Sequence, residues 1–557
     1  MKKSILAVVL SVIMVLGLVG CGGGGQTPEG STGDAAAAGG SDLNVMLETP
    51  VESLDPQQAT DGTSFEVIAD YTDGLMQMDA DGKPVEALAE SYEVSEDGKT
   101  YTFHLRDANW SNGTPVTAAD FVFAWQRAVD PKVASEYAFM MSDCAKIVNA
   151  EEIIAGEKDK SELGVKAVDD KTLEVSLKVP VSYFLSLMYF PTFYPVNEEF
   201  FTSVGEDTFG TSPDTTLSNG AFVLDDYQPA ATAFHLTKNA DYWDADRVQL
   251  PGLNYQVIQD SQQALMSYQS GDLDTTLING DQVDQVADDP AFRTIGAGYL
   301  WYVSVNINGK TAVPEMKSLN TRMALTMAID RETITKEVLK DGSAPTFTAV
   351  PAGYAVGPDG SDFSEDQKKF SDVCRFDKEK AVEFWDAAKK ELGFDTLNIT
   401  MLVDDDDAPR KVSQVLKEQW ETTLPGLTVE LKTQPKKKRL NDMENDNFQM
   451  GLTRWGPDYA DPMTYLGMWK TNNENNFGFW TNKDYDSILL DCSEGELSTK
   501  PEERWEKLYD AEKLVLDDAV IFPIYSQSNA EMLSPNVSGI EFHAVALNRV
   551  YKNAVKK

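Results

Sequence analysis

Two acidic residues stand in a stretch that is otherwise rich in rings, proline and glycine: RWGPDYADPMTYLGMW, residues 454–469. Asp458 and Asp461 are flanked by four aromatic residues, namely Trp455, Tyr459, Tyr465 and Trp469. A carboxylate buried among aromatic side chains is costly unless it has a partner. Asp461 precedes Pro462, a position typical of turns and caps. For Asp458 two interpretations stay open here: a local turn residue, or a carboxylate that binds a cation.

Other residues able to bind metals or act as nucleophiles are dispersed. The histidines, and the cysteines beyond Cys21, lie far apart in the sequence: His104, His235, His543, Cys144, Cys374 and Cys492. The chain has no CxxC or HExxH motif, so we expect neither a transition-metal site nor a cofactor. Three cysteines cannot all pair, and their spacing indicates no disulfide framework. Acid pairs are so frequent in this chain that they do not by themselves indicate a hydrolase.

The charge balance argues against two kinds of partner. The chain of 557 residues has 48 Lys and Arg against 90 Asp and Glu, a formal net charge of −42. Such a chain should repel nucleic acid phosphates and anionic membrane surfaces. Its length suits two or three domains, and 42% hydrophobic residues are enough to build their cores.

The first residues predict a targeting segment. Lys2 and Lys3 precede an apolar run from residue 5 to 19, the pattern of a secretory signal over residues 1–20. Leu18-Val19-Gly20-Cys21 resembles a bacterial lipobox, so we expect Cys21 to be lipidated; the alternative is a simple secretory signal. Residues 21–40 are a Gly/Ala-rich tether. The chain would then be held at the membrane by its lipid alone.

The elements that must position any site alternate between strand and helix. Residues 99–106, 171–179 and 301–308 alternate apolar and polar side chains, which predicts half-buried strands. Residues 117–129 predict a helix, with Thr117 and Asp120 at the spacing of a capping box. Residues 319–339 and 408–424 predict two further helical regions. Together these patterns indicate a mixed α/β protein.

Several stretches, in this order, resemble the extracellular solute-binding proteins of family 5, the receptors of peptide ABC importers. They are residues 53–131, 217–248, 264–277, 319–332, 454–466 and 475–489. The resemblance covers essentially all of residues 42–550. It implies a two-lobed α/β fold of the periplasmic-binding-protein type (class II, cluster C), with an extra domain inserted in lobe one.

The resemblance also implies domain boundaries. Lobe one would comprise residues 41–306, with the inserted domain at about 75–200. Lobe two would comprise residues 307–518, and residues 519–557 would return to lobe one. Two crossing segments would form a hinge, and closure of the lobes would enclose the ligand.

The same family supplies a role for Asp458. Its peptide-binding members use the aspartate of a W-x-x-D-Y motif to bind the ligand's amino terminus, and here that motif runs from Trp455 to Tyr459. The segment that pairs with the peptide backbone corresponds to residues 453–456 and includes Gly456. Arg454 departs from the small residue expected there, so it would shorten the pocket or add a cation.

Three further positions correspond to parts of the family's cleft. Asn475 falls where members place a polar side chain near the ligand. Asp61 belongs to a cleft segment of lobe one, residues 59–62. Tyr302 ends a stretch from Tyr299 that would lie near the hinge and the ligand backbone. The alternative for each is ordinary loop or core packing.

The resemblance therefore predicts a monomeric, lipid-anchored receptor on the extracellular face of a Gram-positive cell membrane. It would bind oligopeptides, deliver them to ABC permease subunits, and catalyse no reaction. Within the family, the ligand could instead be a dipeptide, an oligosaccharide, a nickel chelate or haem. A secreted glycan hydrolase is the hypothesis from a different functional class. A surface chaperone or sensor of signalling peptides would share the same cleft.

Overall fold

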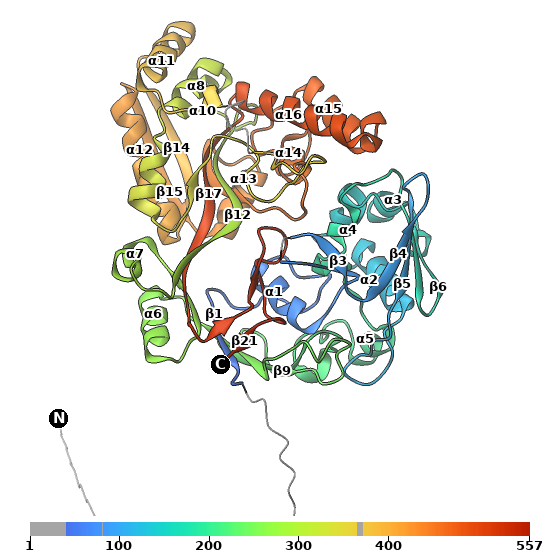
Figure 1. Ribbon diagram of the computed structural model, residues 1–557. Coiled ribbons are helices and arrows are strands. Elements are labelled where there is room, and N and C mark those ends of the chain that lie inside the picture. Colours follow the sequence, from blue (N-terminus) through green and yellow to red (C-terminus); the bar gives the residue numbers. More distant parts are fainter. Residues whose placement is uncertain (1–39, 81, 365–370) are drawn as a thin grey trace, which may run out of the picture. The chain divides into compact units, whose positions relative to one another are not determined.

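The computed structural model describes residues 40–80, 82–364 and 371–557 (Figure 1). The predicted signal segment, most of the predicted tether and Cys21 lie outside these residues. The predictions made for them are therefore not tested by the structure.

The first sheet joins the start of the chain to residues that follow much later. Its order is β1-β10-β9-β8, with β1 parallel to β10 and the other pairs antiparallel. The strands are β1 (Leu43–Leu47), β8 (Phe222–Asp226), β9 (Ala233–Lys238) and β10 (Gly252–Val257). Helix α1 (Gly62–Tyr71) contacts β8 and carries buried apolar residues into the same core.

A second, antiparallel sheet has the order β4-β5-β7-β6. Its strands are β4 (Ala89–Val94), β5 (Thr100–Leu105), β6 (Val165–Asp169) and β7 (Thr172–Ser176). Helix α2 (Ala118–Val129) packs against it and begins with the predicted capping box of Thr117 and Asp120. In β5 the side chains of Tyr101, Phe103 and Leu105 are buried, as the alternation predicts.

The largest sheet has seven strands and carries the W-x-x-D-Y segment. Its order is β11-β17-β12-β16-β14-β15, with β13 beside β17. The strands are β11 (Thr275–Ile278), β12 (Phe292–Val305), β13 (Ala344–Pro345), β14 (Leu397–Asp404), β15 (Leu427–Gln434), β16 (Met450–Trp455) and β17 (Ile521–Leu533). Longer helices that accompany it are α8 (Leu319–Met327), α11 (Lys378–Leu392), α12 (Asp407–Thr423), α13 (Lys436–Glu444), α15 (Lys483–Ser493) and α16 (Pro501–Asp517).

The described residues also contain shorter α-helices and strands. The helices are α3 (Ala150–Ile154), α4 (Phe184–Leu187), α5 (Glu198–Val204), α6 (Ser261–Ser270), α7 (Gly280–Val286), α9 (Arg331–Thr333), α10 (Ser371–Cys374) and α14 (Met463–Leu466). The strands are β2 (Met76–Met78), β3 (Pro84–Glu86), β18 (Val537–Ser538), β19 (Glu541–Phe542), β20 (Arg549–Val550) and β21 (Val555–Lys556).

Two separate hydrophobic cores define two lobes. The core of lobe one draws on residues between Leu43 and Tyr255 and on the C-terminal segment, and the core of lobe two draws mainly on residues between Leu300 and Tyr525. The long strands β12 and β17 pair with each other and extend beyond the core of lobe two (Figure 1). The domain boundaries proposed from the sequence stay predictions, because the two hydrophobic cores do not give the residues at which each domain begins and ends.

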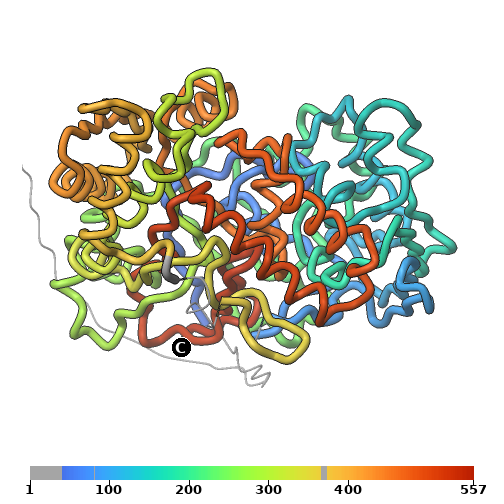
Figure 2. Tube along the Cα trace, turned by 90° about the horizontal axis from the view of Figure 1, so that it is seen from above, coloured from blue at the N-terminus to red at the C-terminus, as the bar shows by residue number. Residues whose placement is uncertain are grey.

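The C-terminal segment returns to lobe one. In Figure 2 its red trace lies beside the blue trace of the N-terminal strand, and Lys556 Nζ donates to the carbonyl of Asp42 at 2.7 Å. Within this segment, the residues between β19 and β20 reach the other lobe. Val545 is buried in the core of lobe two, whereas Leu547 is buried in that of lobe one. This turn therefore contacts both cores.

Two predicted elements need correction. The helical region at 319–339 is interrupted: α8 ends at Met327, and Asp330 accepts the backbone N–H of Thr333 (3.2 Å) to cap a new helix. The strand predicted at 301–308 instead begins at Phe292 and ends at Val305. Its first half contains Gly296 and Gly298 and a register shift against β17, so the sequence shows no regular alternation there.

Candidate functional site

The loop after β16 holds Asp458 without giving its carboxylate a partner. The backbone N–H of Asp458 donates to Thr464 Oγ1 (3.1 Å), and the preceding Pro457 carbonyl accepts from the N–H of Ala546 (3.1 Å). Among the described residues, no cation or hydrogen-bond donor is paired with the side chain of Asp458. Because the half-buried carboxylate is surrounded by protein, its pKa is raised to about 7.

Aromatic residues from both lobes surround this carboxylate. Burial first, and then the charge of Asp458, raise the pKa of the Tyr137 hydroxyl in lobe one well above its ordinary value. Burial raises the pKa of Tyr465 in lobe two in the same way, with contributions from Tyr299 and Asp458. Tyr183 of lobe one stacks on Tyr459 with ring centroids 4.6 Å apart. Asp458 therefore lies where the two lobes meet.

Asp461, three residues on, is fully engaged. Its two oxygens accept from the Arg504 guanidinium at 2.7 and 2.8 Å, and one oxygen also accepts the N–H of Met463 at 3.0 Å. Both charged side chains are buried, with 6% of each exposed. Asp461 caps the turn that leads into α14, which confirms its predicted structural role.

Strand β16 leaves part of one edge free. On one side it pairs with β12 over its whole length, from Met450 to Trp455. On the other side β14 pairs with Met450 and Gly451 alone. Within the described residues no strand covers this second edge from Leu452 to Trp455, just before Asp458. An extended peptide could add there as a further strand.

A bulge in β12 places Tyr299 against this segment. The pairing of β12 with β17 skips Ala297, Gly298 and Tyr299 opposite Gln527. Gly298 has φ +73°, and a Cβ atom there would lie 2.3 Å from the carbonyl oxygen of Ala544, so only glycine fits. Tyr465 donates its hydroxyl to the Gly298 carbonyl and so holds the bulge.

Gly456 is required by the ring of Tyr299. A Cβ atom at position 456 would lie 2.6 Å from Tyr299 Cε1, closer than any carbon contact allows. The neighbouring Trp455 is half-buried, and its indole N–H is buried without a hydrogen-bond partner among the described residues. The ring of Tyr299 therefore packs directly against Gly456, two residues before Asp458 in this chain.

Arg454 lies against the ring of Tyr299 as well, and against that of Trp301. Its guanidinium carbon is 4.8 Å from the ring centroid of Tyr299 and 5.4 Å from that of Trp301. One of its N–H groups donates to Gln527 Oε1 at 3.2 Å. The side chain is half-buried.

The remaining predicted site residues are placed differently. The Asp61 carboxylate caps α1 by accepting from the N–H (3.0 Å) and hydroxyl (2.6 Å) of Ser64, and Gly62 faces the Tyr299 hydroxyl. Asn475 is half-buried, and its backbone N–H donates to Asn473 Oδ1 at 2.8 Å. Tyr302 is 1% exposed in the core of lobe two, where its ring contacts Trp469 edge-on. Within the stretch 299–302, Tyr299 is thus the residue that meets the Asp458 segment.

Sequence reasoning missed several polar groups near this segment. Glu66 of α1 has its pKa raised to about 7, chiefly by burial, while Arg549 opposes that shift. Cys144 is a buried free thiol whose pKa is raised by burial and then by the charge of Asp458. These residues come from distant parts of lobe one, and no local motif marks them. Tyr137 was missed for the same reason.

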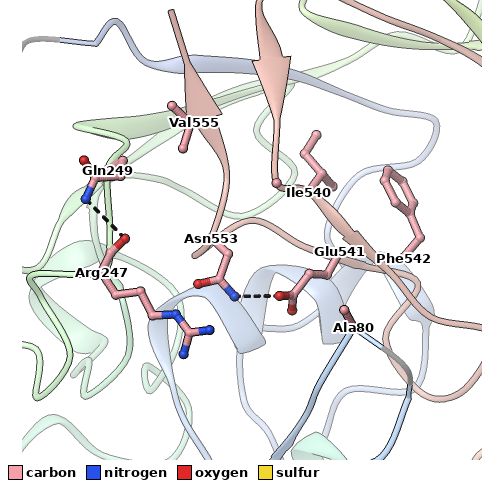
Figure 3. Close-up of a pocket in the computed structure, with 9 residues that line it drawn as sticks. Ala80, Arg247, Gln249, Ile540, Glu541, Phe542, Asn553 and Val555 are labelled. Carbon is pink, nitrogen blue, oxygen red and sulfur yellow. Dashed lines mark hydrogen bonds between the residues drawn. The ribbon is translucent and has the colours of Figure 1, made fainter.

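A pocket of 680 Å³ lies elsewhere, in lobe one (Figure 3). Its lining includes Arg247, Glu541 and Asn553, and the Asn553 side-chain amide donates to Glu541 at 2.7 Å. None of the predicted site residues lines this pocket, so it is separate from the proposed site at Asp458.

The described residues show no group of three His, Cys, Asp or Glu side chains arranged to hold a metal ion. In the same part of the chain, no helix combines the length and the apolar character needed to cross a membrane.

Comparisons with known proteins identify the family. The family model described as "Bacterial extracellular solute-binding proteins, family 5 Middle" matches residues 83–477. A dipeptide-binding protein of Lactococcus lactis subsp. cremoris is 34% identical over 527 residues, covering 92% of this chain and 94% of the relative.

Solved structures agree with this match. OppA of Listeria monocytogenes bound to peptide superposes with a TM-score of 0.81 at 35% identity, covering 93% of this chain and 99% of that one. The substrate-binding domain of an oligopeptide ABC transporter from Bacillus anthracis gives 0.81 at 39% identity, covering 94% and 99%. These neighbours confirm the predicted two-lobed α/β fold. The protein is a binding protein that works outside the cytoplasm, not an enzyme. The chain belongs to the bacterial extracellular solute-binding proteins of family 5.

Proposed function

We propose that this protein is the receptor of a peptide ABC importer, binding oligopeptides between its lobes and delivering them to permease subunits. Relatives over nearly the whole chain are named for dipeptides or oligopeptides, which supports this ligand class. The proposal includes the lipid anchor at Cys21 and the extracellular face of the membrane as its location. Those two parts rest on the sequence of residues 1–40.

The observation that carries the proposal is the unpaired carboxylate of Asp458 beside a free strand edge. A peptide has an ammonium group at its amino end and backbone donors and acceptors along its length, and all of them need partners when it is enclosed. The β16 edge can pair with the backbone whatever the side chains are. The Asp458 carboxylate can accept a charge-assisted hydrogen bond from the ammonium group.

The electrostatics of the site favour this role. An isolated carboxylate with a pKa of about 7 is destabilised in its charged form. An arriving ammonium group would remove that penalty, whereas a neutral sugar would leave it in place. The contact therefore selects ligands with a free amino terminus more than it adds to net affinity.

Native mass spectrometry of protein purified without denaturation tests the ligand class. A retained peptide would support the proposal, and its sequence would define the probe for calorimetry. A retained oligosaccharide, metal chelate or haem would contradict it.

Calorimetry with that peptide tests Asp458 itself. We expect Asp458→Asn to weaken binding by about 2–5 kcal/mol, because the ammonium group would be enclosed without a counter-charge. Asp405→Asn is a matched control, since Asp405 is an exposed acid of the same lobe, and it should leave affinity unchanged. Equal affinity of the Asp458 variant and the unmodified protein would refute the assigned role.

A further inference from the structure

Lys146 and Glu494 form an ion pair between the two lobes. The Lys146 ammonium group donates to the Glu494 carboxylate, although the two residues are 348 positions apart in the sequence. Ile147, next to Lys146, is buried in the core of lobe one, and Cys492, two residues before Glu494, is buried in that of lobe two. Separation of the lobes must therefore break this pair.

The backbone at Lys146 is held in an uncommon conformation. Its φ angle is +55°, in the left-handed region that a residue with a side chain rarely adopts. A π-helical turn, Met140–Cys144, ends two residues earlier, and the N–H of Lys178 donates to the Lys146 carbonyl at 2.7 Å. Such conformations persist where the surrounding structure enforces them, and they are frequent at functional sites. The fold thus fixes the backbone from which the Lys146 side chain reaches Glu494.

The charges around this pair are complementary across the lobes. The hydrogen bond from Lys146 is the main cause that lowers the pKa of Glu494, and the charges of Lys470 and Lys178 add to it. Burial raises the pKa of Asp143 in lobe one, and the charges of Lys146 and Lys470 oppose that rise. Lobe one thus presents an acid and a lysine, Asp143 and Lys146, to a lysine and an acid of lobe two. Complementary charges of this kind favour one register of two surfaces over others.

The pair lies away from the strands that connect the lobes. Glu494 directly follows α15, and α3 begins four residues after Lys146. In Figure 1, α15 and α3 lie on the right of the molecule, whereas the crossing strands β12 and β17 lie to the left of them. A rotation of the lobes about these strands displaces distant residues more than near ones. Even a small opening would therefore separate Lys146 from Glu494.

The ion pair differs from the ring contact between the lobes in its response to salt. Tyr183 and Tyr459 stack through apolar surfaces, and dissolved ions do not screen such a contact. The Glu494 side chain is 42% exposed and that of Lys146 is 14% exposed, so solvent ions reach the pair. Salt weakens the attraction between such charges. The response to salt therefore separates the contribution of the ion pair from that of the rings.

We propose that Lys146 and Glu494 form a latch that holds the lobes closed over a bound peptide and slows its release. The inference rests on the proposed function, because a latch of this kind needs an enclosed ligand. A contact made only in the closed state contributes its whole free energy to closure and nothing to the folding of either lobe. Ion pairs with exposed members are weak, so the expected effect on the release rate is about two- to fivefold.

The test measures peptide release from the full-length protein. The probes are alanine peptides with free termini, from dipeptide to hexapeptide, and the one that calorimetry finds to bind most tightly is used for kinetics. Stopped-flow dilution, followed by the protein's tryptophan fluorescence, gives its release rate at about 0.05 M and about 0.5 M NaCl. The proteins compared are the unmodified chain, Lys146→Met, Glu494→Gln and the variant with both substitutions. The control is Lys513→Met, which removes an exposed ion pair with Asp517 inside α16.

We expect each single substitution to speed release about two- to fivefold at the lower salt concentration. The double variant should release the peptide as fast as the single variants and no faster, because all three lack the same contact. Higher salt should speed release from the unmodified protein by a similar factor and leave the three variants unchanged. Lys513→Met should behave as the unmodified protein does.

Two results would overturn the inference. The first is a release rate that stays the same in both single variants as in the unmodified protein. The second is a double variant in which the effects of the two substitutions multiply, since the two residues would then act separately. Failure of every peptide to bind the unmodified protein would instead overturn the proposed function, and this inference with it.

Discussion

Asp458 and Asp461 belong to one loop, yet the structure treats their charges in opposite ways. Asp461 accepts two hydrogen bonds from Arg504 and one from the backbone of Met463. Asp458 has no partner for its carboxylate among the described residues, and its pKa is raised to about 7. The loop thus contains one acid whose counter-charge comes from the same chain and one that has none in the described residues, for which the proposed function supplies a ligand's ammonium group.

This difference separates Asp461, which stabilises the loop, from Asp458, for which we propose a role in binding. A buried ion pair adds little net stability, but breaking one is expensive because a charge is left without a partner. Selection for folding therefore explains Asp461. The unpaired Asp458 has a cost in the unliganded protein, and the proposed binding of a ligand's ammonium group would offset it.

The largest expected effect is the loss of stability when the ion pair of Asp461 and Arg504 is broken. Asp461→Asn should lower the free energy of unfolding by about 3–5 kcal/mol, because Arg504 would stay buried without its acid. Denaturant unfolding of the unliganded protein measures this. Asp458→Asn is the matched control, and it should leave stability unchanged or raise it, since it removes an unpaired charge. Similar losses in both variants would show that the two acids are not different.

A second prediction concerns the pH dependence of peptide affinity, which we expect to follow the protonation of the unpaired Asp458. Below about pH 7 the unliganded protein holds a proton on Asp458, and an ammonium group must displace it. Peptide affinity should therefore fall by up to about tenfold per pH unit between pH 7 and 5, as measured by calorimetry. Burial raises the pKa values of the neighbouring Tyr137, Tyr299 and Cys144, so these groups stay neutral in this range.

Stability should change with pH in a related way. The pKa of Asp458 is raised from 3.8 in the fold, so its contribution to stability is fully present below pH 3.8 and is lost as pH rises through 7. Glu66 also titrates near pH 7. Denaturant unfolding of Asp458→Asn across this pH range separates the two groups: a pH dependence of stability that persists in this variant would assign the effect to Glu66.

The smallest expected effect sharpens the geometry of the loop. Gly456→Ala should cost about 1–3 kcal/mol of stability, with a loss of peptide affinity, because the methyl group would displace the Tyr299 ring. Gly467→Ala is the control, since a Cβ atom there has no neighbour within 4 Å. Normal affinity and stability of Gly456→Ala would mean that the ring moves freely and does not shape the site.

The local parts of this picture were predictable from sequence. The alternation in β5 and the capping box of α2 appear in the structure because each depends on neighbours along the chain. The turn role of Asp461 was readable from Pro462. Its partner Arg504 was not, because the pair joins residues 43 positions apart.

The arrangement across the lobes was beyond sequence reasoning. Tyr299 and Tyr302 are both tyrosines of β12, but the bulge at Gly298 turns Tyr299 towards Gly456 and leaves Tyr302 in the core. A bulge shifts register by tertiary contacts that no local pattern encodes. The ring of Tyr137 near Asp458 likewise depends on how the two lobes meet.

The turn between β19 and β20 has a consequence for how the protein is made. Val545 fills a place in the core of lobe two, Leu547 fills one in lobe one, and Ala546 holds the Pro457 carbonyl next to Asp458. These residues are synthesised after most of the residues that form both cores. Domains form largely in the order of synthesis. The loop that carries Asp458 is therefore completed only after residues 545–547 have been made, so a chain that ends before them would lack this support.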